Sequence, residues 1–182
     1  MENIQKYSRR VRRVLQGLFI LAPLLTLYYW LTVNTGMDAL FRSGIIETDL
    51  DPMIFASEPL TMTTRFLAFL ASMLPCGILM YALQQLIHLF RHYENQEIFT
   101  LATATHYQKL GYVFFYWAAG AFLYSGLISV ILSFNNPPGE RVLSLTFTGI
   151  DLLSILCGFV VLIISWVMKE AQKIADEHMH TV

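Results

Sequence analysis

Hydrophobic residues along this 182-residue chain gather into four long runs, which polar segments separate. At a rise of 1.5 Å per residue, a helix of about 20 apolar residues crosses a hydrocarbon core of about 30 Å. Each run has about that length. We therefore predict four membrane-spanning helices, at residues 14–33, 66–88, 111–134 and 150–168.

The composition agrees with this pattern. The chain is 55% hydrophobic and 14% charged, whereas soluble domains are usually about 45–50% apolar and about 25% charged. We predict one all-α integral membrane domain, a four-helix bundle. Cys76 and Cys157 both lie inside apolar runs without metal-ligand spacing, so we interpret them as small packing residues.

The basic residues predict which segments face the cytoplasm, where Lys and Arg are enriched. The N-terminus, the loop 89–110 and the tail 169–182 carry most of them, while the loops 34–65 and 135–149 carry few. The first three segments carry nine basic residues: Lys6, Arg9, Arg10, Arg12, Arg13, Arg91, Lys109, Lys169 and Lys173. The two other loops carry three: Arg42, Arg65 and Arg141. We predict an N-in, C-in topology with helical cytoplasmic extensions.

Several polar residues mark helix ends and turns. Thr100 is predicted to cap a helix that runs without a break through Gly111 into the third span. Residues 135–140, Asn-Asn-Pro-Pro-Gly-Glu, predict a turn. Asp151 follows Thr148 and Gly149, so we interpret it as a capping carboxylate in the first turn of the fourth helix, stabilised by the helix dipole.

Two further patterns concern packing within the membrane. The aromatic residues at 28–30 (Tyr-Tyr-Trp) are expected at the outer interface, which such rings prefer. Small residues recur at four-residue spacing in the third and fourth spans: Ala121, Ser125, Ser129, Ser154 and Gly158. Small residues allow helices to approach closely, so these predict contacts within the bundle or a homodimer seam.

The histidines are the candidates for metal binding. His88 and His92 are four residues apart and therefore share a helix face. His106, His178 and His180 are predicted on the same side of the membrane, and imidazoles can bind zinc or iron. No HExxH motif occurs, so solvated interfacial histidines are the favoured interpretation, and we predict no metal and no cofactor.

Other chemistry finds little support in the sequence. There is no G-x-S-x-G elbow, P-loop or glycine-rich dinucleotide turn, so we do not expect an enzyme. No charged residue lies in the middle of a span, which disfavours a proton-coupled transporter or an ion channel. The N-terminal bases are explained by topology and anionic lipid, so no direct nucleic-acid binding is expected.

Short motifs resemble a bacterial group of small integral membrane proteins, domain-of-unknown-function family 2975 (the YoaS-like group). The resemblance rests on residues 97–100 (Glu-Ile-Phe-Thr), 110–112 (Leu-Gly-Tyr) and the C-terminal tail, and covers mainly the second half of the chain. The tail residues that match are Glu170, Ala171, Ile174, Asp176, Glu177, Thr181 and Val182. Here Gln96 stands where the family usually has glycine, residues 101–103 replace an acidic pair, and His178 and His180 are added. The resemblance implies four spans, a bacterial inner-membrane location and often a neighbouring gene for a helix-turn-helix regulator, but no established activity.

We therefore predict a non-enzymatic inner-membrane protein whose cytoplasmic loop and tail bind a protein partner, such as a regulator, or a second copy of the chain. Phe99 would anchor the tail, whose carboxylates would cap the helix at Thr100. The residues assigned to this surface are Glu97, Phe99, Thr100, Gly111, Asp176, Glu177 and Thr181. The alternatives are a metal- or small-molecule-handling protein that uses the cytoplasmic histidines, and a transporter accessory subunit with a polar cavity reaching Asp151.

Overall fold

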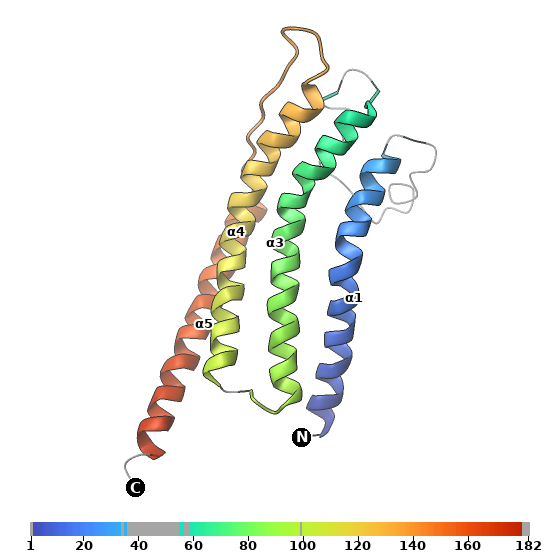
Figure 1. The fold of residues 1–182 in the computed structure, drawn as a ribbon. Coiled ribbons are helices and arrows are strands. Elements are labelled where there is room, and N and C mark those ends of the chain that lie inside the picture. The colour runs from blue at the N-terminus through green and yellow to red at the C-terminus, as the bar shows by residue number, and fades with distance from the viewer. Residues whose placement is uncertain (1, 34, 36–54, 57–58, 99, 180–182) are drawn as a thin grey trace. The chain divides into compact units, whose positions relative to one another are not determined.

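The computed structural model describes residues 2–33, 35, 55–56, 59–98 and 100–179, without the side chains of residues 2–3 and 175–179. This part of the chain contains no strand. It forms four helices: α1 (Glu2–Thr32), α3 (Met62–Glu94), α4 (Leu101–Ser133) and α5 (Gly149–Met179) (Figure 1). All four are long and apolar enough to cross a membrane, and the described residues confirm the predicted all-helical fold.

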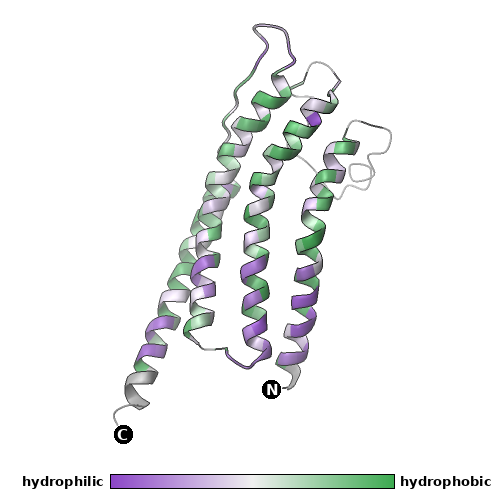
Figure 2. Ribbon diagram, in the orientation of Figure 1, coloured by the Kyte–Doolittle hydropathy of each residue, from purple (hydrophilic) through white to green (hydrophobic). Residues whose placement is uncertain are grey.

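The helices extend well beyond the apolar runs that predicted them. Helices of 31 to 33 residues are about 45–50 Å long, whereas the hydrocarbon core is about 30 Å thick. Hydrophilic residues gather in the first half of α1, the second half of α3, near the start of α4 and in the last turns of α5 (Figure 2). As predicted, α4 runs unbroken through Gly111 and α5 continues into the tail.

The chain divides into two compact units, which we describe separately. Unit 1 comprises Met1–Ile20, Ile78–Ala119 and Thr148–Val182. Unit 2 comprises Leu21–Gly77 and Gly120–Phe147.

The core of unit 2 is built around Trp30, which is 3% exposed. Its indole Nε1 donates to Ser72 Oγ at 2.8 Å. Ser72 Oγ donates its own hydrogen to Ala68 O at 2.9 Å, so the Tyr124 hydroxyl, 3.0 Å away, must be the donor to Ser72. The ring is thus enclosed by unit 2 rather than facing lipid, while its depth at the outer interface stays a prediction. Its N–H finds a partner inside the protein because Ala68 and Ser72 on α3 leave room for the ring.

The ends of the unit 2 helices are satisfied by side chains from other segments. Arg65 Nη1 donates to Trp30 O at 3.2 Å and Leu31 O at 3.1 Å, which are carbonyls of the last turn of α1. Such carbonyls have no partner within their own helix. After α4, the predicted turn at 135–140 is present: Glu140 N donates to Pro137 O at 3.1 Å, and Gly139 has a φ of 103° that suits glycine.

An extended segment, residues 141–147, follows this turn and lies along α4. Ser133 Oγ accepts from Val142 N at 3.1 Å and Ser129 Oγ accepts from Ser144 N at 3.0 Å. Ser125 Oγ accepts from Thr146 N at 3.0 Å. The three serines are four residues apart, and they bind alternate residues of the segment, because alternate backbone groups of an extended chain point to the same side. We call these residues the serine row.

The serine row corrects the sequence-based interpretation of Ser125 and Ser129. Both were predicted to pack against another helix, whereas their hydroxyls bind the backbone of the extended segment. Gly126 lies between them, and a Cβ added there would lie 2.7 Å from Leu145 Cδ2. Small residues do allow close approach here, as predicted, but the neighbour is an extended chain.

In unit 1, α4 and α5 pack closely through glycines. A Cβ on Gly158 would lie 3.1 Å from Gly111 O and 2.7 Å from Phe115 Cε2. Ser165 Oγ on α5 donates to Ala104 O on α4 at 2.7 Å. Gly158 thus has the packing role that its spacing predicted, while Ser154 is partly exposed and donates to Ile150 O of its own helix.

Candidate functional site

The residues that directly follow α3, 95–97, are held by backbone contacts. Asn95 N and Glu97 N both donate to His92 O at 3.0 Å. Gln96 has a φ of 63°, in the left-handed region that L side chains rarely adopt. A left-handed residue directly after a helix is a common way to end it, and glycine is the usual choice. Position 96 therefore favours glycine on backbone grounds.

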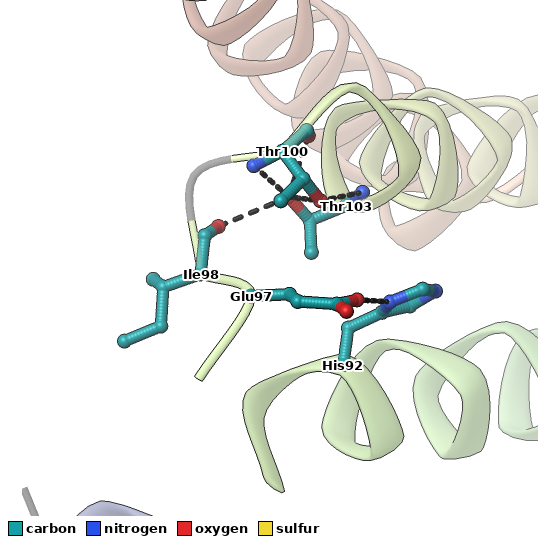
Figure 3. A network of polar contacts seen from close by, with 5 residues as sticks. All are labelled: His92, Glu97, Ile98, Thr100 and Thr103. Carbon is teal, nitrogen blue, oxygen red and sulfur yellow. Dashed lines mark hydrogen bonds and ion pairs between the residues drawn. The ribbon is translucent and has the colours of Figure 1, made fainter. Parts of the chain in front are cut away.

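Two threonines start α4 (Figure 3). Thr103 N donates to Thr100 Oγ1 at 3.3 Å, and Thr100 N donates to Thr103 Oγ1 at 3.1 Å. This is a reciprocal cap in which Thr103 takes the place usually held by Glu or Gln. Thr103 Oγ1 also lies 3.0 Å from Ile98 O and 2.7 Å from Thr100 O, which are acceptors for its hydrogen. Thr100 is thus the N-cap that the sequence predicted.

Glu97 reaches back across the turn to α3. Its Oε2 lies 2.6 Å from His92 Nδ1 (Figure 3). The contact is partly exposed, with side-chain exposures of 28% for His92 and 49% for Glu97. It ties the last turn of α3 to Glu97, so that local contacts hold the residues directly after α3 and those that start α4.

The structure brings three predicted histidines together, from two helices. The His106 ring stacks on His88 with a centroid distance of 5.6 Å and an interplanar angle of 7°. His92 lies at the same centroid distance from His106, tilted by 42°. We call His88, His92 and His106 the imidazole cluster.

The hydrogen bonds of the imidazole cluster define which nitrogen carries the hydrogen. His88 Nδ1 lies 2.7 Å from Gln84 O, and a carbonyl oxygen only accepts, so this nitrogen is the donor. His92 Nδ1 faces the Glu97 carboxylate, and His106 Nδ1 faces Gln85 Oε1 at 2.9 Å. In each neutral ring, Nε2 is therefore the basic nitrogen. Burial, followed by the charge of Lys109 and the other two rings, lowers the pKa of His106, which precedes the predicted span 111–134.

This arrangement does not assemble a metal site as it stands. In the described part of the chain, no group of three or more His, Cys, Asp or Glu side chains is placed to hold a metal ion. His178 belongs to α5, but its side chain lies outside the described residues, as does all of His180.

The predicted docking of the tail also falls outside the described residues. Phe99 and Thr181 are not described, nor are the side chains of Asp176 and Glu177 on α5. Gly111 lies among the described residues. A Cβ there would lie 3.2 Å from Leu162 N, so this residue of the motif packs closely against α5.

Asp151 is part of a helix cap. Its Oδ2 accepts from Thr148 N and from Thr148 Oγ1, both at 2.8 Å, and Asp151 N lies 3.4 Å from Thr148 Oγ1. This is the capping-box arrangement, with Asp at the position that Glu or Gln usually holds. Asp151 is 4% exposed. The capping interpretation made from the sequence is confirmed.

Sequence reasoning missed two contacts of unit 1. Arg12 Nε donates to Glu94 Oε1 at 2.8 Å and Arg12 Nη2 to Glu94 Oε2 at 3.2 Å. The hydroxyls of Tyr93 and Tyr107 lie 2.6 Å apart, which joins α3 to α4. Arg12 was interpreted only as one of the topology-setting charges, and nothing in the sequence distinguished it from its basic neighbours.

Comparison with known families identifies the chain at the family level. Residues 52–182 match the family model described as "Protein of unknown function (DUF2975)". The chain belongs to the DUF2975 family. The match includes all of α3, α4 and α5, so it extends further toward the N-terminus than the motifs that suggested the resemblance. No curated protein and no solved structure matches the chain.

Proposed function

We propose that this DUF2975 protein is a non-enzymatic, multi-pass protein of the bacterial inner membrane, with both termini and the α3–α4 turn in the cytoplasm. The distribution of basic residues supports this orientation. The Arg12–Glu94 ion pair also supports it, because it joins the basic start of α1 to the end of α3 within unit 1.

We propose further that the α3–α4 turn is a contact surface for a protein partner. The observation that carries this proposal is that local contacts hold the end of α3 and the start of α4 while neighbouring side chains remain exposed. The exposed residues are Asn95, Gln96, Glu97, Leu101 and Ala102. Leu101 is 59% exposed although it begins the helix well before the predicted span at 111. A pre-ordered surface loses less conformational entropy when it binds.

The polar groups of the site favour a contact surface over catalysis or transport. Glu97 binds His92, the two threonines cap α4, and Asp151 caps α5. These groups serve the structure of the chain itself. The accessory-subunit alternative needed Asp151 to face a polar path, and its capping contacts account for it without one.

Site-specific photo-crosslinking in native membranes tests the contact surface. A photoreactive residue at position 96 or 101 is expected to capture the same partner. The matched control is position 7, because Tyr7 is 63% exposed on α1, on the same proposed side of the membrane. Capture at 96 and 101 but not at 7 supports the proposal. No adduct at either turn position, or the same adducts at all three, contradicts it.

The imidazole cluster supports a second candidate function, the handling of a transition metal. In all three rings Nδ1–H faces an oxygen, which leaves Nε2 available. Metal-binding histidines commonly have this tautomer. The rings would have to turn for these atoms to converge. Zinc titration of the purified protein, with His106→Asn as the comparison, decides this candidate. Binding that His106→Asn leaves unchanged excludes the cluster as the ligand set.

A further inference from the structure

Four basic residues form a stripe along one face of α1. Lys6, Arg9, Arg10 and Arg13 have the spacing i, i+3, i+4, i+7, which places them on one side of a helix. All four are exposed, and with Gln5 they line a surface hollow of about 410 Å³. We call these four residues the basic stripe.

Arg12 differs from the stripe although it lies among the same bases. It points to another face of α1, where its guanidinium is bound by the Glu94 carboxylate. Among the described side chains, no carboxylate forms an ion pair with a residue of the stripe. One of the five N-terminal charges is therefore neutralised within the protein, and four are presented together at the surface.

The predicted span places the three arginines of the stripe at the depth of the lipid headgroups and Lys6 just beyond them. Arg13 is the last residue before the predicted span at 14–33. Lys6 lies about 10 Å further along the helix axis, and the headgroup layer on each side of a bilayer is about 5–8 Å thick. A guanidinium group binds a phosphate through two parallel hydrogen bonds, and three of the four residues are arginines.

We infer that the basic stripe is a binding site for the phosphate groups of anionic phospholipids in the leaflet next to the N-terminus. The inference goes beyond the proposed contact surface and does not depend on it, because the stripe lies on α1 and the contact surface on the α3–α4 turn. Electrostatic attraction to anionic lipid is expected to contribute about fivefold in relative affinity for each basic residue. This attraction weakens with salt.

Lipid selectivity of the full-length protein tests the inference. The protein is reconstituted in phosphatidylcholine nanodiscs with either spin-labelled phosphatidylglycerol or spin-labelled phosphatidylcholine. Electron paramagnetic resonance then gives the relative association of each lipid from its motionally restricted fraction. The wild type is expected to prefer phosphatidylglycerol, and the preference should fall about fivefold for each of Lys6→Gln, Arg9→Gln, Arg10→Gln and Arg13→Gln. Circular dichroism checks that each variant keeps its helices.

Matched variants separate the stripe from a general charge effect. Arg12→Gln and Lys173→Gln each remove one charge outside the stripe and are expected to lower the preference less than any stripe variant, because Glu94 already binds Arg12 and Lys173 lies on another helix, α5. Equal association of both lipids in the wild type overturns the inference, as does an equal loss in the stripe and control variants. Inorganic phosphate is the further competitor. Abolition of the lipid preference by phosphate, but not by chloride of equal ionic strength, would assign the stripe to free phosphate instead.

Discussion

Arg12 on α1 and Glu94 on α3 form a two-point ion pair, with 2.8 Å between Nε and Oε1 and 3.2 Å between Nη2 and Oε2. The Glu94 side chain is 12% exposed. Because both groups are charged and partly buried, removing either one should destabilise the protein by about 1–3 kcal/mol. Thermal unfolding in detergent of Arg12→Gln, Glu94→Gln and the double variant forms a cycle that measures the coupling. Losses that simply add in the double variant would show that the two residues do not stabilise each other.

The α4–α5 packing predicts that two glycines in different helices respond differently to alanine. Gly158→Ala places a Cβ 3.1 Å from Gly111 O, a backbone atom that cannot move away easily. We expect a loss of about 1–3 kcal/mol in the free energy of unfolding. Gly77→Ala is the control, because a Cβ there meets nothing within 4 Å and alanine favours the helix by about 1 kcal/mol. Similar unfolding temperatures for the two variants would contradict the close packing.

The serine row predicts local release of the extended segment. Ser129 is fully buried, and its hydroxyl accepts from Ser144 N at 3.0 Å. Ser129→Ala leaves that N–H without its partner at a cost of about 1–3 kcal/mol. Hydrogen–deuterium exchange of residues 141–147 should therefore become faster. Ser154→Ala serves as the control, since Ser154 Oγ donates only within its own helix. Unchanged exchange in Ser129→Ala would mean that the row does not hold the segment.

The left-handed conformation at the end of α3 predicts a stabilising substitution. Gln96 has a φ of 63°, which costs an L residue about 1–2 kcal/mol that glycine avoids. Part of this gain is offset by the greater freedom of glycine in the unfolded chain, so Gln96→Gly should stabilise by about 0.5–1 kcal/mol. Asn95→Gly at the neighbouring position should destabilise. The unfolding midpoints of the two variants check both signs.

Hydropathy and helix length were enough to predict the four helices and the unbroken course of α4. Short-range motifs also predicted the caps at Thr100 and Asp151, because a cap depends on residues that are close in sequence. The enclosure of Trp30 could not be predicted this way. Hydropathy cannot distinguish a ring that faces lipid from one whose N–H finds a partner such as Ser72 on another helix. The spacing of Ser125 and Ser129 identified a helix face but not the segment that covers it.

The candidate site shows the same limit. The four-residue spacing of His88 and His92 predicted that they share a face, while the stacking of His106 on them depends on how α3 and α4 pack. The sequence does not distinguish Arg12 from its basic neighbours, because its partner Glu94 lies 82 residues away. Contacts between helices far apart in sequence require the fold.

The orientation of the chain in the membrane is tested most directly by labelling of single cysteines. Cys76 and Cys157 are replaced by alanine, and one cysteine is introduced in place of the exposed Asn95 or the exposed Glu140. Intact spheroplasts are then treated with a membrane-impermeant maleimide. We predict labelling at position 140 in intact spheroplasts, and at position 95 only after the membrane is permeabilised. Labelling at position 95 in intact spheroplasts would place the α3–α4 turn outside the cell and contradict a cytoplasmic contact surface.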